Sequence, residues 1–303
     1  MSRLCLGTRG STLALAQSAW VKRQIEEHVA QLQVELRVIK TSGDRFLDKP
    51  IQNLGGKGVF TQEIEDALLR GEIDLAVHSL KDLPTQLPKG LVIAAVPKRE
   101  DARDVLIARE KRKLGELAPG ARVGTGSLRR RAQLLNQRPD LTIVPVRGNI
   151  DTRLRKLDEG EFDALIMAAA GLRRIGCENR IGEFLGDDVC VSAVAQGALG
   201  IESRDDATLR ERFAFLHDAG SFAEVSAERA LLDRLGGGCH VPIGARARLA
   251  GDELRLTGVV ASPDGAKLCR GEIFGLASEA GDLGKRLADQ LLSQGADKLL
   301  ASI

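Results

Sequence analysis

The first two-thirds of the 303-residue chain repeats itself in outline, and this repeat restricts the folds that the chain can adopt. The turn GTRGS at residues 7–11 follows a short apolar run, and so does GTGS at residues 124–127. GEID at 71–74 and GEFD at 160–163 each precede a strand-like apolar run. Paired turns of this kind predict two similar α/β lobes facing each other across a cleft, where ligands usually bind.

The two lobes differ where the second pair of apolar runs ends. After the first run the chain continues with HSLKDLP at 78–84, and after the second it continues with MAAAGLRR at 167–174. One lobe therefore offers a single carboxylate, Asp82, among cations, whereas the other offers cations only. This asymmetry is the main functional signal in the sequence.

Composition excludes several classes of protein. The chain is 43% hydrophobic and 28% charged, which is an ordinary globular mixture, and its net charge of +2 does not indicate binding to nucleic acid or to a membrane. No apolar run approaches the length of a membrane span, and the N-terminus does not read as a secretory signal, so we expect a cytoplasmic protein. The five cysteines are widely scattered, with no spacing typical of zinc or of a disulfide framework, and we expect no metal.

Strand-like and helix-like segments alternate through both lobes, which predicts an α/β fold with mainly parallel sheets whose ligands bind at the carboxyl ends of the strands. Ser11 is a predicted helix N-cap, and 42–58 is a predicted long mobile loop. From about Ser221 the pattern changes to a helix followed by period-two segments, which predicts a small α+β domain with an antiparallel sheet. The predicted division is a first lobe of 1–98 with 197–216, a second lobe of 99–196, and a third domain of 217–303.

The segment Gly124–Arg131 indicates an anion site. Its GTGS turn lies at a predicted helix start, where free amides and the helix dipole favour an anion. Arg129, Arg130 and Arg131 follow directly and oppose that dipole, which is tolerable if a bound anion neutralises them. A solvated basic helix is the alternative.

More arginines lie at or just beyond predicted strand ends of the second lobe. Arg9, in the matching turn of the first lobe, and Lys57, in the loop, would face them. Guanidinium groups suit bidentate binding of carboxylate or phosphate, so the predicted ligand is an anion with many such groups. The second-lobe residues are Arg147, Arg153, Arg173 and Arg174.

Two further residues could carry chemistry. Asp82 holds a neighbouring cation in place, or it stabilises positive charge that develops on a substrate or passes protons to a leaving group. Cys239 follows three glycines, which permit a tight exposed turn, so it is a candidate nucleophile or attachment point, although most loop cysteines are structural. His78 and His240 are predicted to pack or to form hydrogen bonds rather than to catalyse.

Taken together, these segments closely resemble the porphobilinogen deaminase (hydroxymethylbilane synthase) family through most of the chain. The resemblance implies two periplasmic-binding-protein-like lobes of type II and a small third domain. The motifs that carry it are GTRGSTLALAQ, GGKGVFTQEIE, AVHSLKDLPT, REDARDVL, VGTGSLRRRAQL, VRGNIDTRL, ALIMAAAGLRRI and AERALLDRLGGGCHVPIGA.

The resemblance also implies the chemistry. Cys239 would hold one dipyrromethane cofactor through a thioether, and Asp82 would help the aminomethyl group of porphobilinogen to leave as ammonia and stabilise the cation that results. The terminal α-carbon of the growing chain would attack that cation, and four such additions followed by hydrolysis would give hydroxymethylbilane. Six pyrroles with two carboxylates each would account for a cationic cleft in a chain of low net charge.

Site residues follow from the matching motifs. Those matched to cofactor binding are Lys81, Thr125, Ser127, Arg129 and Arg130. Those matched to binding of substrate or of the growing chain are Arg9, Ser11, Lys57, Phe60, Arg147, Arg153, Arg174 and Gln196, of which Lys57 and Phe60 belong to the loop.

The chain departs from the family pattern at Asn53, Ala193, Ala195 and His240; relatives more often carry Pro and Gly at the positions of Ala193 and Ala195. We expect a monomer that binds porphobilinogen and neither nucleic acid nor membrane. Two alternatives remain open: a non-catalytic two-lobed anion receptor or sensor, and a Schiff-base enzyme that uses Lys81 or Lys57. Neither uses Asp82 together with Cys239.

Overall fold

The computed structural model describes residues 2–42, 61–237 and 241–301, which form two compact units. The first unit consists of Met1–Arg99 and Ala198–Phe222, and the second of Glu100–Gly197 and Ala223–Ile303.

The strands are β1 Ser2–Thr8, β2 Leu32–Val38, β3 Leu75–Ser79, β4 Leu91–Ala95, β5 Asp104–Ala108, β6 Arg122–Gly124, β7 Thr142–Val144, β8 Ala164–Ala168, β9 Glu183–Phe184, β10 Leu199–Arg204, β11 Ile243–Ala250, β12 Glu253–Ala261 and β13 Leu268–Leu276. The α-helices are α1 Thr12–His28, α3 Gln62–Leu69, α4 Leu128–Gln137, α5 Ile150–Asp158, α6 Ala169–Arg174, α7 Ala207–Arg212, α8 Ala219–Arg234, α9 Ala280–Ser293 and α10 Ala296–Leu300.

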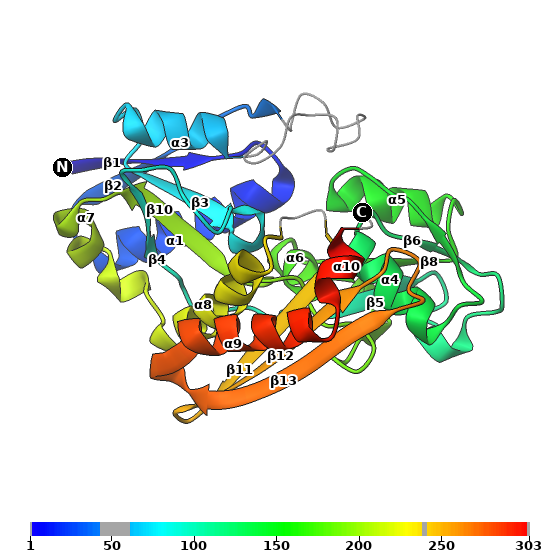
Figure 1. Cartoon of the computed structure of the whole chain (residues 1–303). Helices are drawn as coiled ribbons and strands as arrows, with labels where there is room; N and C mark the ends of the chain where they lie inside the picture. The colour runs from blue at the N-terminus through cyan, green and yellow to red at the C-terminus, as the bar shows by residue number, and fades with distance from the viewer. Residues whose placement is uncertain (1, 43–60, 238–240, 302–303) are drawn as a thin grey trace. The chain divides into compact units, whose positions relative to one another are not determined.

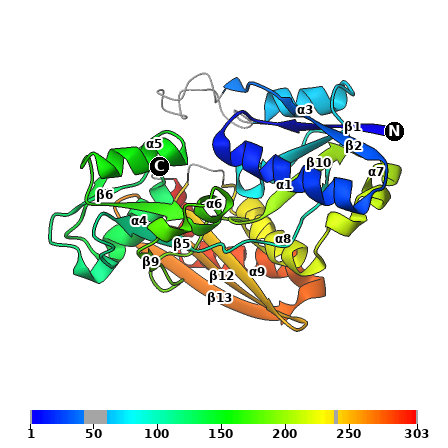
Figure 2. The ribbon, with the colours of Figure 1, turned by 180° about the vertical axis from the view of Figure 1, so that it is seen from behind.

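The first unit is built on one mixed sheet with the strand order β2-β1-β3-β10-β4 in the described residues. β1 pairs in parallel with β2 and β3, whereas β10 runs antiparallel to β3 and β4, so every strand except β10 points the same way. Alternate residues face opposite sides: Leu75 and Val77 pack toward α1, and Ala76 packs toward α3. Figures 1 and 2 show these two helices on opposite faces of the sheet.

The second unit contains a sheet with the matching order β7-β6-β8-β5-β9. β6 pairs in parallel with β7 and β8, and β5 runs antiparallel to β8 and β9, as β10 does in the first unit. The antiparallel strand of each sheet comes from the other end of the chain order. β5 directly follows β1–β4 in the sequence but joins the sheet of β6–β9, and β10 follows β6–β9 but joins the sheet of β1–β4. The predicted repeat of two α/β lobes is thus confirmed by the identical strand orders.

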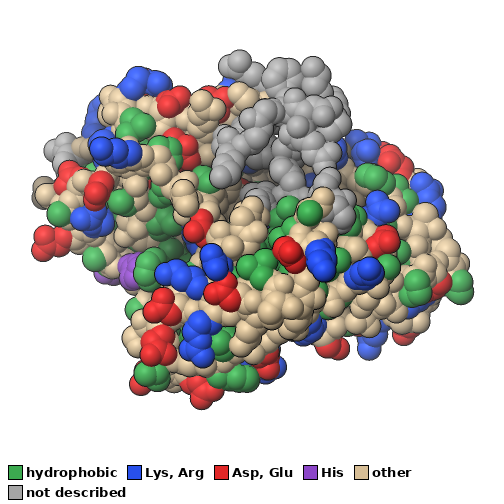
Figure 3. All heavy atoms as spheres, viewed as in Figure 1, with side chains coloured by type: hydrophobic (Ala, Val, Ile, Leu, Met, Phe, Trp, Pro, Cys, Tyr) green, Lys and Arg blue, Asp and Glu red, His purple; other side chains and the backbone are tan. Residues whose placement is uncertain are grey.

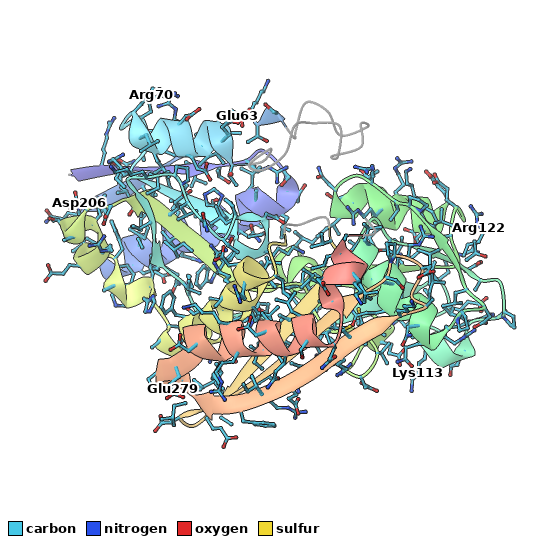
Figure 4. All side chains as sticks on the ribbon, viewed as in Figure 1. Glu63, Arg70, Lys113, Arg122, Asp206 and Glu279 are labelled. Atoms are coloured by element: carbon cyan, nitrogen blue, oxygen red, sulfur yellow. The ribbon has the colours of Figure 1, made fainter. Side chains whose placement is uncertain are left out.

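The two GE-x-D turns have the same structural role in both sheets. In the first unit the Asp74 carboxylate accepts a hydrogen bond from the Cys5 backbone N–H at 2.8 Å, and the Asp74 N–H donates to the Cys5 carbonyl. Asp163 makes the same pair of hydrogen bonds with the backbone of Arg122 at the start of β6. Arg122 is labelled in Figure 4. Each aspartate therefore fastens the start of the third strand of its lobe to the first strand.

The second unit also holds the three-stranded antiparallel sheet β11-β12-β13, as the period-two pattern predicts. Leu231 from α8 and Leu287 and Leu291 from α9 close over Gly258 of β12, so both helices cover one face of this sheet. Figure 1 shows α9 lying along β12 and β13. The turn between β12 and β13 reaches α4, where the Asn136 amide donates to the Gly265 carbonyl at 2.9 Å.

The expected α/β class, with a small antiparallel sheet in addition, is confirmed. None of the described helices is long and apolar enough to cross a membrane. On the face that Figure 3 shows, acidic and basic side chains are interspersed, in keeping with the small net charge.

Candidate functional site

In the first unit the candidate residues follow the carboxyl ends of neighbouring parallel strands. β1 ends at Thr8 and is followed by Arg9 and Ser11, and β3 ends at Ser79 and is followed by Lys81 and Asp82. Ser11 caps α1, because its hydroxyl accepts a hydrogen bond from the Ala14 N–H at 3.3 Å, as predicted.

The single-turn 3-10 helix Leu80–Asp82 presents the candidate catalytic carboxylate. Leu80 and Leu83 on either side are buried, Lys81 is partly exposed, and Asp82 is exposed. The Leu80 N–H donates to the Ala198 carbonyl at 3.0 Å. A Cβ placed on Gly200 would lie 2.9 Å from Leu80 Cδ1 and 3.3 Å from Leu83 Cδ1, so this glycine makes room for both leucines. The turn with Asp82 is therefore anchored on β10.

In the second unit the GTGS turn lies between the end of β6 and the start of α4. Ser127 is the N-cap of α4, and its N–H donates to the Thr125 hydroxyl at 3.2 Å. A Cβ on Gly126 would come within 2.7 Å of the Val146 carbonyl oxygen, so only glycine allows the turn to pass this close to the segment after β7. The free amides at the start of α4 suit an anion, as the sequence predicts.

Arg129 and Arg130 are buried, and both bind the carboxylate of Asp104 at the start of β5. Arg129 Nη1 lies 2.6 Å from Asp104 Oδ2, while Arg130 Nε and Nη2 lie 3.0 and 2.8 Å from Oδ1. The anion that makes these cations tolerable at a helix start is thus supplied in part by the chain itself. Burial alone would raise the pKa of Asp104, but the charges of Arg129 and Arg130 outweigh it and hold this pKa well below its usual range.

Further buried groups complete this arrangement around Asp104. The Gln196 amide donates to Asp104 Oδ1 and to the Ala102 carbonyl, each at 2.8 Å. The Cys190 thiol lies 3.3 Å from Asp104 Oδ2, and burial, followed by the charge of Asp104, raises its pKa to about 12. Cys190 is therefore a neutral hydrogen-bond donor and not a reactive thiolate.

Arg147 and Arg153 lie together with Arg130 after the carboxyl ends of β6 and β7. Arg153 is partly buried, and its Nε donates to the Gly148 carbonyl at 2.8 Å. Burial, followed by repulsion from Arg130 and Arg147, lowers the pKa of Arg153 to about 10. Cations that destabilise one another in this way would be stabilised by an anionic ligand.

The two arginines at the end of α6 have different partners. Arg173 pairs with Glu100 at 2.7 Å and with Asp101 at 3.7 Å. Arg174 Nη2 donates to the Gly197 carbonyl at 2.6 Å, and burial lowers its pKa to about 10. Of the two, Arg174 is the better candidate for an external anion.

The return crossover that carries Gln196 is held by a buried acid. Ala195 has a φ of 58°, a left-handed conformation that glycine adopts more easily. The Ala195 N–H donates to Glu228 Oε2 at 2.6 Å, and the Ala247 N–H donates to Glu228 Oε1 at 2.8 Å. Glu228 of α8 thereby joins the crossover to β11.

Several predicted residues lie outside the described ranges: Lys57 and Phe60 of the loop, Cys239, and the departures Asn53 and His240. Within the described residues, no group of three or more His, Cys, Asp or Glu side chains could hold a metal ion.

Asp104 is not among the site residues that were predicted from the sequence. The available signal was its position as the last acid of REDARD, directly before the apolar run VLIA, because an acid at the start of a buried strand needs a cationic partner. The sequence prediction for His78 is confirmed, since this side chain is buried and contacts Glu202.

Comparison with known proteins covers nearly the whole chain. Residues 4–211 match a family model described as porphobilinogen deaminase, dipyromethane cofactor binding domain, and residues 222–293 match the C-terminal domain of porphobilinogen deaminase. The porphobilinogen deaminase of Pelobacter propionicus is 50% identical over 302 residues, covering 99% of this chain and 97% of the relative. That of Syntrophobacter fumaroxidans is 51% identical over 299 residues, covering 98% and 97%.

Solved structures with a similar arrangement are more distant. A methionine-binding protein aligns with 71% of this chain and 89% of its own, at 14% identity and a TM-score of 0.46. A putative methionine-binding lipoprotein from Bacillus subtilis aligns with 71% and 90%, at 12% identity and a TM-score of 0.42.

Proposed function

The chain belongs to the porphobilinogen deaminase family, and we propose that it condenses four porphobilinogen molecules head to tail, with loss of ammonia, and releases the linear tetrapyrrole hydroxymethylbilane by hydrolysis. The observation that carries this proposal is the family match over residues 4–211 and 222–293. A non-catalytic anion receptor is not favoured, because the curated relatives are named as deaminases over almost their full length.

The second unit fits a polycarboxylate such as dipyrromethane. Arg153 is a partly buried cation whose charged form is destabilised by Arg130 and Arg147, and an anion nearby would reverse that effect. The GTGS turn adds the amides of a helix start and the Ser127 hydroxyl. Arg129 and Arg130 are partly neutralised by Asp104, whereas Arg153 and Arg174 are cations whose pKa is lowered by burial and which an anion would stabilise.

The cofactor is one dipyrromethane attached through the sulfur of Cys239, and no metal takes part. Support for the attachment comes from the sequence, where three glycines precede the only cysteine of the GGGCHVPIG segment. When bound, this group supplies the pyrrole α-carbon to which the first substrate is joined. Lys81, Thr125, Ser127, Arg129 and Arg130 orient its carboxylates.

Asp82 acts on the incoming substrate. Its carboxylate is exposed on a turn that is fixed by the burial of Leu80 and Leu83, so it can approach the aminomethyl group without a rearrangement of the backbone. Asp82 transfers a proton to the amino group, which leaves as ammonia, and the resulting carboxylate stabilises the positive charge that remains on the substrate. Arg9 and Ser11, which follow the neighbouring strand β1, bind substrate carboxylates, together with Lys57, Phe60, Arg147, Arg153, Arg174 and Gln196.

The remaining features of the proposal concern the whole protein. It works as a cytoplasmic monomer, with porphobilinogen as its partner and without nucleic acid or membrane. Its domains are a first lobe of 1–98 with 197–216, a second lobe of 99–196, and a third domain of 217–303 that carries Cys239.

A direct experiment separates the enzyme from the binder. Purified protein incubated with porphobilinogen should release ammonia and a linear tetrapyrrole, and Asp82→Asn should abolish both while the cofactor stays attached. Arg131→Gln is a matched control, because Arg131 is exposed on the same helix as Arg129 and should be dispensable. Binding of porphobilinogen without release of ammonia by the parent protein would contradict the proposal.

A further inference from the structure

A cluster of buried titratable groups lies in the first unit beneath the strand that leads to Asp82. His78 Nε2 lies 2.9 Å from Glu202 Oε2, and the two side chains are only 4% and 0% exposed. Glu65 of α3 is buried beside them, and burial, with a further contribution from the charge of Glu202, raises its pKa. The proposed chemistry uses none of these three groups.

The His78–Glu202 contact crosses the antiparallel pair β3–β10. Gly200 lies opposite His78, and Glu202 lies opposite Ala76, so the two side chains are diagonal neighbours on the face that α3 covers. Neither Glu202 oxygen has a hydrogen-bond partner among the described residues, and the polar contact of this carboxylate is the approach of His78 Nε2 to 2.9 Å. Loss of His78 would leave a buried carboxylate without a partner.

Stability alone explains this pair poorly. A buried pair of polar side chains often contributes less to folding than apolar side chains of the same volume would, and its best-attested role is to fix one register among several. β3 and β10 need such a device, because the whole of the second lobe separates them in the sequence and no short turn sets their alignment.

The register of β3 against β10 determines where Asp82 lies. In the observed register Gly200 lies opposite His78 and receives the side chains of Leu80 and Leu83. A slip of two residues would put a residue with a side chain in this place and push the turn away from the sheet. The Leu80 N–H would also lose the Ala198 carbonyl, to which it donates at 3.0 Å.

We propose that the buried His78–Glu202 pair is a register lock, which means that it fixes the alignment of β3 with β10 and so positions the Asp82 turn for catalysis. His78 and Glu202 are thus positioning residues, acting through Leu80, Leu83 and Gly200, and Glu65 completes the polar pocket from α3. This inference rests on the proposed function for its kinetic readout but not for its structural one.

The decisive variant is the double substitution His78→Leu/Glu202→Leu, which removes the polar pair but keeps the core filled. We expect a folded protein with full cofactor by intact mass, a KM within about twofold of the parent and a kcat at least tenfold lower, since small misplacements of catalytic groups are costly. Hydrogen exchange at the Leu80 amide should become faster. A parental kcat together with parental exchange at Leu80 would overturn the proposal.

Two further variants separate positioning from loss of stability. Glu202→Gln keeps the shape and a polar oxygen beside His78, so its kcat should stay within about threefold of the parent. Val77→Ala, on the opposite face of the same strand, should lower Tm and leave kcat unchanged, because Val77 packs in the core toward α1.

If the double variant does not fold, His78→Asn decides, since its shorter side chain leaves a polar group but no longer reaches Glu202. Its kcat should fall without a rise in KM, and a parental kcat would contradict the register lock. If the parent protein does not turn over porphobilinogen at all, the proposed function fails, while exchange at Leu80 still tests the lock.

Discussion

Replacement of Asp104 by asparagine tests how much the second unit depends on one buried charge. Arg129, Arg130 and Gln196 all donate hydrogen bonds to this carboxylate, and Asp104 itself is 0% exposed. Asp104→Asn keeps the shape but leaves two buried guanidinium groups without their counter-charge. Breaking a buried ion pair from one side usually costs about 3–5 kcal/mol, and we expect a loss in this range at pH 7.

The pH dependence gives this prediction a second test. Because the folded state holds the pKa of Asp104 below its unfolded value of about 3.9, the carboxylate stabilises the fold above that pH. Its contribution is lost as the pH falls from about 4 toward the lower pKa of the folded state. The difference in stability between parent and Asp104→Asn should therefore be constant near neutrality and shrink below about pH 4.

Urea unfolding followed by circular dichroism between pH 2.5 and 7 measures both effects. Asp140→Asn is the control, because the Arg138–Asp140 pair is at the surface and should contribute little. A loss below about 1 kcal/mol at pH 7, or a difference that does not change with acid, would refute the assignment of Asp104 as the counter-charge of Arg129 and Arg130.

Three further outcomes are expected. Asp82→Asn should lower kcat at least about 100-fold in a turnover assay while intact mass still shows the cofactor, and near-normal turnover would refute its role. Arg153→Ala should stall elongation and give discrete masses of enzyme with incomplete chains; an unchanged product distribution would count against this assignment. Gly126→Ala should destabilise the protein by about 1–3 kcal/mol in urea unfolding, because its Cβ would lie 2.7 Å from the Val146 oxygen, and parental stability would contradict the close approach.

The parts of the fold that depend on local sequence could be predicted. The turns GEID and GEFD predict two equivalent lobes, and Asp74 and Asp163 do form the same pair of hydrogen bonds in each. Ser11 and Ser127 are N-caps, as hydroxyl residues before helical segments usually are. The arginines after β6 and β7 lie near one another because carboxyl ends of parallel strands share an edge.

Long-range contacts could not be predicted in the same way. The antiparallel direction of β5 and β10 in their sheets leaves no local trace, since the residues of a strand do not indicate which way it runs beside its neighbours. Asp104 lies far from Arg129 in the sequence, so their pairing follows only from the assembled sheet. The role of Glu228 at the strained Ala195 likewise depends on a helix from another part of the chain.

The most direct test of the central claim is the intact mass of the untreated, active protein. The proposal predicts a mass above that of the sequence by one dipyrromethane, and a Cys239→Ser variant with the sequence mass alone and no turnover. Cys190→Ser is the control and should keep the added mass, because Cys190 is buried against Asp104 and Arg129. Full activity in protein that has only the sequence mass would contradict the account.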